Sequence, residues 1–192
     1  MNPAGDQRKV ILAMSASLDG FLAHEDNEID WMSEAGAAAE VAGAARHRAN
    51  LELLGQTGLI ILGRRAYDDM APAWSGSDSP MAQLMNSLPK LVFSRTAPEF
   101  EWANASHTTR PVEDEIPKLK RRGEGDIVCF GGARFAHSLA RHRLVNEYRL
   151  TVHPVALGKG LALWHGLPEP QRFAPVSSCA YPDGSVTHVL AG

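Results

Sequence analysis

A strand-to-helix transition through two glycines constrains the fold of this chain more than any other feature. Residues 127–130 form a short apolar run rich in β-forming residues, and residues 133–141 favour a helix. Gly131 and Gly132 lie between them and bring bare backbone N–H groups to the carboxyl edge of a sheet. Unpaired N–H groups and the helix dipole both favour an anionic ligand there. A glycine pair also suits a plain tight turn, and this segment by itself does not separate the two interpretations.

Apolar runs of strand length alternate with helical segments along the rest of the chain. This alternation predicts an α/β fold of three layers, with a mostly parallel central sheet flanked by helices. Two strand-like runs on either side of Pro182-Asp183-Gly184 predict a C-terminal antiparallel hairpin. We expect strands at residues 9–17, 21–23, 59–62, 90–93, 105–108, 127–130, 147–155, 172–181 and 185–190, and helices at residues 34–55, 63–70, 81–87, 112–122 and 133–141.

Length and composition predict one globular domain over residues 1–192, with residues 1–8 mobile. The chain has no apolar run of membrane-spanning length, and its polar start does not resemble a signal peptide, so we expect a cytoplasmic protein. A net charge of -3 and a pI near 6.2 argue against a protein that coats nucleic acid or an anionic membrane. A small molecule is therefore the expected partner.

The cysteines and histidines give no sign of a metal site. Cys129 and Cys179 are 50 residues apart, belong to no metal-ligand spacing, and are expected to be buried free thiols. The eight histidines are scattered without paired ligand spacings, so no metal is expected. His153, before Pro154 in a strand-like run, is expected to be packed or at a pocket rim.

Three of the expected strands end in residues suited to phosphate. Arginines follow Gly63, hydroxyl side chains flank Arg95, and the glycine pair follows residue 130. Ligands of open α/β sheets bind outside the carboxyl ends of the strands, so the three ends are expected to meet at one site. Fixed charge, hydroxyls and backbone N–H groups together suit a dinucleotide that carries an extra phosphate. Solvated surface charge is the ordinary fate of an arginine, but three consecutive strand ends of this kind favour the ligand.

The usual Rossmann fingerprint is absent, because its third glycine is missing after the glycine pair. The Walker lysine pattern is absent as well. The chain instead resembles the dihydrofolate reductase-like proteins, and within them the branch typified by the reductase domain of riboflavin biosynthesis, the RibD C-terminal type. The resemblance covers about residues 9–190. Its motifs, in order, are Ser17 to Ala23 with Asp30-Trp31, Leu62 to Tyr67, Val92 to Thr96, Gly131 to Ala133, and Pro154 to Gly160.

The resemblance implies an NADPH-dependent reductase that transfers a hydride to a small heterocycle, similar to 5-amino-6-(5-phosphoribosylamino)uracil reductase or to dihydrofolate reductase. It also makes a homodimer an expectation. It implies that the cofactor phosphates contact the ends of two strands, that the adenosine end with its 2′-phosphate contacts a third, and that the nicotinamide lies beside the first strand. The implied phosphate contacts are Gly63, Arg64, Arg65, Gly131, Gly132, Ala133 and Arg134. The implied contacts of the adenosine end and its 2′-phosphate are Ser94, Arg95 and Thr96, and the residues beside the nicotinamide are Met14, Ser15 and Leu22.

The match is incomplete at three places. Ala66 stands where family members usually have threonine, and Asn146 precedes Glu147 where an Asp-Glu pair is common. Residues 32–36 offer no clear equivalent of the helix carboxylate found in folate-reducing enzymes, which puts folate reduction in question.

Proton delivery to a reduced substrate needs a group within hydrogen-bond reach of the acceptor. Asp19 and Asp30 are the candidate catalytic acids, with bound water as an alternative, although Asp19 also suits a turn and Asp30 a loop or cap. Trp31 is the candidate substrate-stacking residue, and Trp74 is a second one; packing in the core would explain either equally well. The rival hypothesis is a nucleotide-binding protein that keeps the fold and has lost the chemistry.

Overall fold

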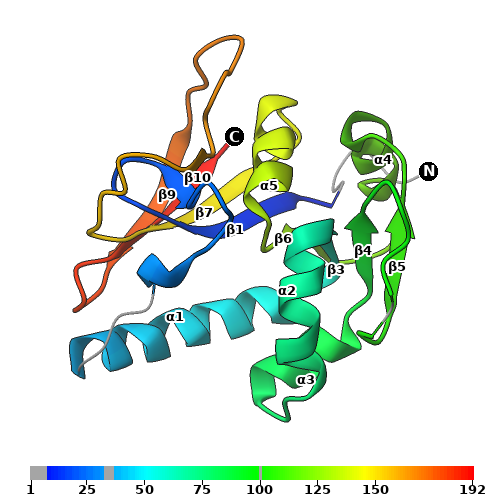
Figure 1. The fold of residues 1–192 in the computed structure, drawn as a ribbon, viewed down its shortest axis with the longest axis horizontal. Helices are drawn as coiled ribbons and strands as arrows, with labels where there is room; N and C mark the ends of the chain where they lie inside the picture. The colour runs from blue at the N-terminus through cyan, green and yellow to red at the C-terminus, as the bar shows by residue number, and fades with distance from the viewer. Residues whose placement is uncertain (1–7, 33–36, 100) are drawn as a thin grey trace.

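The computed structural model describes residues 8–32, 37–99 and 101–192. Its centre is an eight-stranded sheet in the order β5-β4-β3-β6-β1-β7-β10-β9 (Figure 1). The strands from β5 to β7 are parallel, and the C-terminal pair β9 and β10 is antiparallel, which confirms the predicted sheet. The bounds of the ten strands are β1 Val10–Ala16, β2 Phe21–Ala23, β3 Thr57–Gly63, β4 Lys90–Phe93, β5 Ala105–Thr108, β6 Asp126–Cys129, β7 Glu147–Val152, β8 Leu161–Ala162, β9 Ala174–Ala180 and β10 Val186–Ala191. Strands β2 and β8 form a small sheet of their own.

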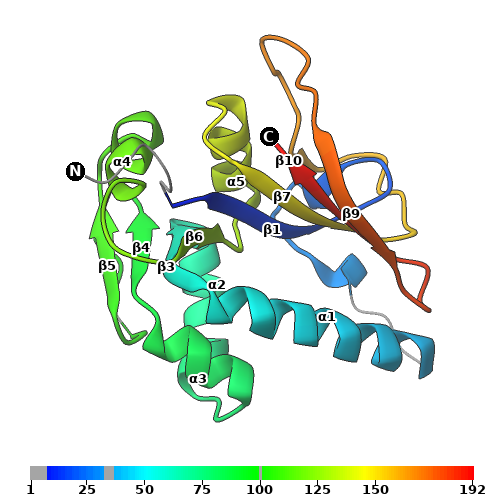
Figure 2. The same cartoon turned by 180° about the vertical axis from the view of Figure 1, so that it is seen from behind.

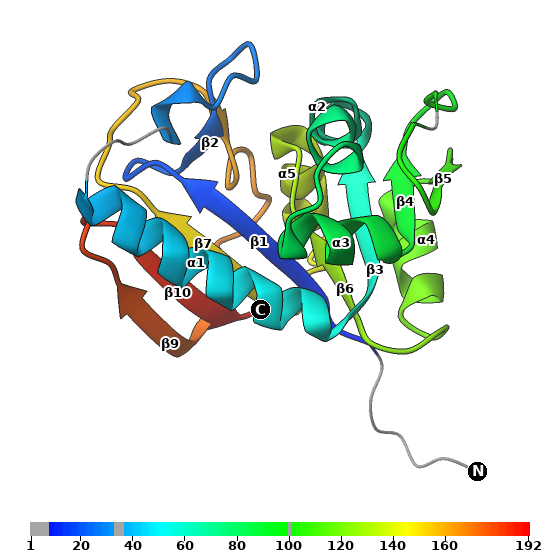
Figure 3. The ribbon, with the colours of Figure 1, turned by 90° about the horizontal axis from the view of Figure 1, so that it is seen from below.

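Helices cover both faces of the large sheet, as the sequence predicts. Helices α1 and α3 lie on one face and α4 and α5 on the other, while α2 lies at the carboxyl ends of the central strands (Figure 3). A short 3-10 helix, Asp30–Met32, precedes α1. The helices are α1 Ala37–Gly55, α2 Arg64–Ser75, α3 Pro80–Ser87, α4 Val112–Leu119 and α5 Ala133–Arg141.

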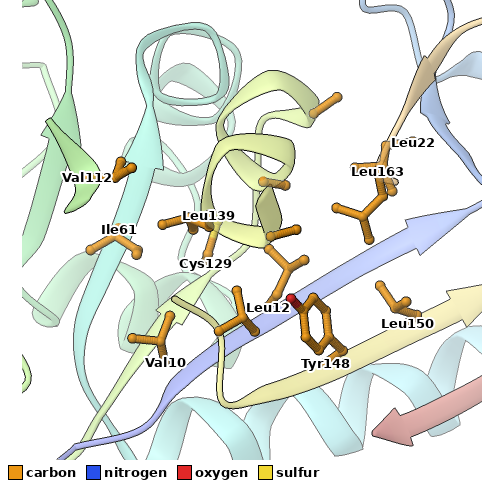
Figure 4. Close-up of a cluster of buried hydrophobic side chains, with 14 of the residues drawn as sticks. Val10, Leu12, Leu22, Ile61, Val112, Cys129, Leu139, Tyr148, Leu150 and Leu163 are labelled. Atoms are coloured by element: carbon orange, nitrogen blue, oxygen red, sulfur yellow. The ribbon is translucent and has the colours of Figure 1, made fainter. Parts of the chain in front are cut away.

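The side chains of β1 alternate between the two faces, and this alternation places the site residues. Val10 and Leu12 pack with Leu139 of α5 and with Tyr148 of β7 (Figure 4). Ile11 packs instead with Leu53 of α1 and with Val128, and Ala13 lies beside that cluster. Because strand side chains alternate with a period of two, Ser15 follows Ile11 and Ala13 on the α1 side.

Helix α2 runs past the proline at which the sequence predicted its end. The helix continues to Ser75 with Pro72 inside it, so the prediction was wrong at this boundary. Proline removes one backbone donor and crowds the preceding turn. The buried face formed by Ala66, Tyr67 and Ala71 packs into the core and offsets that cost.

The two cysteines have opposite environments. Cys129 is buried, as predicted, and its burial raises the pKa of the thiol to about 12. Cys179 is exposed, so the expectation that it is buried was wrong. It lies on β9, the outermost strand of the sheet (Figure 2), and every residue of that strand is exposed. Two further expectations, mobility over residues 1–7 and a helix start at residues 34–36, lie outside the described residues.

A salt bridge ties the C-terminal hairpin to α1. Asp183, in the turn between β9 and β10, accepts hydrogen bonds from Arg46 of α1 and from Ser185, and its carboxylate is almost fully buried. Burial by itself raises the pKa of Asp183, but the hydrogen bonds and the arginine charge outweigh it and lower the pKa to about 2. The charged carboxylate is therefore the form that the fold stabilises.

We expect Asp183→Asn to lower the free energy of unfolding at pH 7 by about 1.5–3 kcal/mol, because it removes charge-assisted hydrogen bonds. A carboxyl with a depressed folded pKa stabilises the fold above its unfolded pKa and loses that contribution as the pH falls through the folded value. The difference between wild type and variant should therefore shrink between pH 4 and pH 2. Urea unfolding across this range measures it, and a difference independent of pH would contradict the assignment.

Candidate active site

The three phosphate-suited strand ends meet at one edge of the sheet. Strands β4, β3 and β6 are parallel neighbours, and the N–H of Gly63 donates to the carbonyl of Gly131 at 3.3 Å. The peptide bond between Gly131 and Gly132 is cis. A Cβ on Gly63 would lie 2.8 Å from Cβ of Phe135, so glycine is required for the close approach of β3 to α5.

A large cavity of about 1070 Å³ opens at this edge, beside the ends of β1, β3 and β6. Its polar lining includes the first-turn arginines of α2, and its apolar lining comes from methionine and aromatic side chains. Of the predicted cofactor residues it contains Met14, Ser15, Leu22, Gly63, Arg64, Arg65, Gly131, Gly132 and Arg134. Ala133 does not line it; it is buried as the first residue of α5.

A second cavity of about 680 Å³ adjoins the first at the ends of β4 and β5. Arg64, Phe93 and Ser138 line both cavities, so the two are neighbouring parts of one surface. The predicted residues Ser94, Arg95 and Thr96 line the second cavity. The hydroxyl of Ser94 donates a hydrogen bond to the carbonyl of Thr96 and accepts one from its N–H, which closes a tight turn around Arg95.

The arginines of the site differ in how far their charge is already neutralised. Arg64 and Arg65 form i,i+4 ion pairs with Asp68 and Asp69, at 2.8 Å and 2.9 Å. The fixed positive charge expected at the start of α2 is therefore shared with carboxylates. Arg95 is exposed, and no carboxylate of the described residues pairs with it. Its guanidinium is available for an anion.

Asp19 holds a turn instead of facing the cavity. Its carboxylate accepts hydrogen bonds from the hydroxyl of Ser17 at 2.6 Å and from the N–H groups of Leu157 at 3.1 Å and Gly158 at 2.7 Å. These bonds lower the pKa of Asp19 to about 2. A carboxylate that stays ionised and lies outside the lining of both cavities is a poor proton donor, so the position of Asp19 does not favour the acid role expected from the sequence.

Asp30 and Trp31 also lie outside the lining of both cavities. The carboxylate of Asp30 is largely exposed and lies 3.2 Å from Nε2 of His24. Trp31 packs edge-on against the ring of His153, with centroids 5.6 Å apart. The predicted roles as acid and as stacking platform are thus not favoured by their positions. Trp74, the second stacking candidate, does line the large cavity.

Several cavity residues had no clear signal in the sequence. Asn50 reaches the cavity from α1, and Met81 and Met85 reach it from α3, although neither helix adjoins a phosphate-suited strand end. Phe93, Phe130 and Ser138 were missed as well, and for Phe93 and Phe130 the position at a strand end was an available clue. Arg110, which lines the second cavity, forms an ion pair with Glu115 at 3.1 Å.

The RibD C-terminal domain profile matches residues 8–187, which is nearly the whole chain. The chain belongs to the RibD C-terminal domain family. The uncharacterized protein YyaP of Bacillus subtilis (strain 168) is 28% identical over 185 residues, covering 94% of this chain and 93% of the relative.

The fold of this chain is similar to that of solved structures, dihydrofolate reductase among them. A protein from Shewanella sp. PV-4, provisionally assigned to riboflavin biosynthesis, superposes with a TM-score of 0.73 at 20% identity, covering 95% of this chain and 98% of that one. The deaminase/5-amino-6-(5-phosphoribosylamino)uracil reductase of Thermotoga maritima gives 0.67 at 15% identity, with 96% and 56% covered. Dihydrofolate reductase from Enterococcus faecalis, complexed with NADP(H), gives 0.60 at 13% identity, with 97% of each chain covered. The predicted family and fold are confirmed.

The described residues contain neither a metal-ligand cluster nor a membrane-spanning helix. No three histidine, cysteine, aspartate or glutamate side chains within residues 8–32, 37–99 and 101–192 are grouped as metal ligands would be. Over the same ranges, every helix is too short or too polar to cross a membrane.

Proposed function

We propose that this protein is an NADPH-dependent reductase that transfers a hydride to a small heterocyclic substrate of the pteridine or ribosylaminopyrimidine type. One observation carries the proposal. Three neighbouring parallel strand ends, bearing arginines, hydroxyls and a glycine pair, open onto two adjoining cavities. An extended, multiply phosphorylated ligand suits such an edge, because each strand end offers a different contact to phosphate.

The residues present fit the cofactor. Gly131 and Gly132 with the start of α5 would hold the pyrophosphate, together with Arg134 and the paired Arg64 and Arg65. Ser94, Arg95 and Thr96, at the second cavity, would hold the adenosine end and its 2′-phosphate. The large cavity beside Met14, Ser15 and Leu22 leaves room for the nicotinamide and a substrate. NADPH supplies the hydride when it is bound.

The apolar wall of the large cavity supports the proposed substrate class. Met70, Trp74, Met81, Met85 and Phe130 line it, and such side chains suit a planar heterocycle. The Thermotoga maritima and Enterococcus faecalis proteins, named for a uracil reductase and for dihydrofolate reductase, support this class by analogy of fold. A homodimer and a cytoplasmic location remain predictions; the exposed outer strand β9 offers a second copy an unpaired edge.

Titration of tryptophan fluorescence tests the proposal, since Trp74 lines the large cavity. NADPH should change the emission at lower concentration than NADH does. Incubation of the complex with dihydrofolate, a dihydropterin and 5-amino-6-(5-phosphoribosylamino)uracil should then show oxidation of NADPH with at least one of them. Absence of NADPH binding would refute the proposal, whereas binding without turnover of any heterocycle would favour the rival, a nucleotide-binding protein without catalysis.

A further inference from the structure

Since Asp19 and Asp30 do not line the cavity, the polar side chains that do line it decide which group can act on a substrate. Two carboxylates, Glu28 and Asp69, line the large cavity, but both pair with Arg65, at 3.6 Å and 2.9 Å. The arginines at the start of α2 belong to the proposed phosphate contacts. Ser15 lies instead at the end of β1, beside Met14 and the proposed nicotinamide position.

A buried histidine lies within hydrogen-bonding distance of the Ser15 hydroxyl. Nε2 of His153 lies 3.1 Å from Oγ of Ser15, and the histidine residue is 3% exposed. Its backbone N–H donates to the carbonyl of Ala16 at 2.8 Å, and its ring packs edge-on against Trp31. These contacts hold the imidazole in one place, so the serine hydroxyl meets a preorganised partner.

The segment that follows His153 is fixed to the same strand. The N–H of Leu18 donates to the carbonyl of Val155 at 2.7 Å, and Asp19 binds the backbone at Leu157 and Gly158. These hydrogen bonds connect the turn after β1 to the loop after β7, beside the serine–histidine pair.

We propose that the Ser15 hydroxyl, held by His153, is a catalytic hydrogen-bond donor to the substrate. It contacts the nitrogen or oxygen of the C=N or C=O group whose carbon is reduced. His153 is the positioning residue: with its proton on Nε2 it donates to Oγ, which leaves the serine proton free to point into the cavity. A donor aimed at developing negative charge lowers the barrier of such a step. The inference rests on the proposed function and names the group that acts on the substrate.

The reaction balances without a protein acid. The carbon gains the two electrons and the hydrogen of the hydride, the double bond becomes single, and the heteroatom takes its proton from water. Ser15 keeps its own proton throughout. The opposite tautomer, with the proton on Nδ1, would make the serine donate to Nε2 and offer the substrate only lone pairs, so the tautomer decides between the two arrangements.

The test compares Ser15→Ala, His153→Leu and His153→Gln with wild type, using the same three heterocycles. In single turnover, Ser15→Ala should slow hydride transfer about 10²-fold, as loss of a transition-state donor does, while NADPH affinity stays within about twofold. His153→Leu should slow it about tenfold, and His153→Gln, which keeps an N–H donor, should restore most of the rate. Thr187→Val is the matched control, because its hydroxyl lies on β10 and bonds only Thr151 in the described residues.

A second readout needs no turnover. In ¹⁵N NMR of the protein with NADP⁺, the Nε2 signal of His153 should show a protonated nitrogen, and it should shift when a heterocycle is added but not in Ser15→Ala. An unprotonated Nε2, or a Ser15→Ala variant that changes KM alone, would overturn the proposal even where NADPH binding and turnover stand. Loss of NADPH binding by the wild-type protein, in contrast, would refute the proposed function itself, and the Nε2 signal of the free protein would still decide the tautomer.

Discussion

Gly63→Ala is expected to impair both stability and cofactor binding. The new Cβ would lie 2.8 Å from Cβ of Phe135, an atom that cannot move without shifting the start of α5. Overpacking of this kind costs about 1–3 kcal/mol of unfolding free energy. Since Phe135 lies in the first turn of α5, three residues after Gly132, the shift should also displace Gly131 and Gly132 and weaken NADPH binding about tenfold, equivalent to ~1.4 kcal/mol. Thermal unfolding and fluorescence titration measure the two effects.

Gly43→Ala is the matched control for this prediction. A Cβ on Gly43, in the middle of α1, would meet no atom within 4 Å. Alanine in a helix interior is better than glycine by about 0.5–1 kcal/mol, so this variant should be slightly more stable and bind NADPH unchanged. An unaltered NADPH affinity in Gly63→Ala would show that the end of β3 does not shape the phosphate site.

Arg95→Ala should reverse the preference for NADPH over NADH. The Arg95 guanidinium lines the second cavity and pairs with no carboxylate of the described residues, so its full charge is available to a 2′-phosphate. Hydrogen bonds to charged groups contribute about 1.5–3 kcal/mol, which predicts a loss of about 10- to 150-fold in NADPH affinity. NADH, which lacks that phosphate, should bind within about twofold of its wild-type affinity.

Arg141→Ala provides the control, because Arg141 is also exposed but lies at the far end of α5. It removes the same formal charge and should leave both affinities unchanged. The Arg95 effect should shrink at high salt, since an exposed charge is screened. Equal losses of NADPH and NADH in Arg95→Ala would move the 2′-phosphate contact to another residue, with Arg110 of the second cavity as the next candidate.

Local sequence patterns were sufficient for most elements of the fold, although the short strand β8 and the 3-10 helix Asp30–Met32 were not predicted. The apolar run at residues 127–130 with the helix at residues 133–141, and the hairpin around Asp183, appear where they were expected. The prediction failed where burial outweighed a local rule. Pro72 does not end α2, because the buried face of that helix compensates for the missing donor. Cys179 is exposed although its strand looked apolar, because β9 has a neighbour on one side only.

The candidate site, like the fold, could be predicted from the sequence only in part. Glycines and arginines at strand ends could be found from the sequence, because parallel strands bring their carboxyl ends together wherever they lie in the chain. Side-chain partners could not be found, because they depend on contacts between distant segments. Asp19 binds the backbone at Gly158, and His153 meets Ser15 across 138 residues of chain.

From the sequence alone the α/β sheet and the order of its motifs could be determined, since these follow from local periodicity and the rules of strand connection. The sequence also predicts that an anionic ligand binds at the carboxyl edge of the sheet. The tertiary structure decided which charges remain available and which polar groups face the cavity. It paired Arg64 and Arg65 with carboxylates, left Arg95 unpaired among the described residues, and placed His153 behind Ser15. Such outcomes depend on distances of a few ångströms between side chains, which only the packed fold sets.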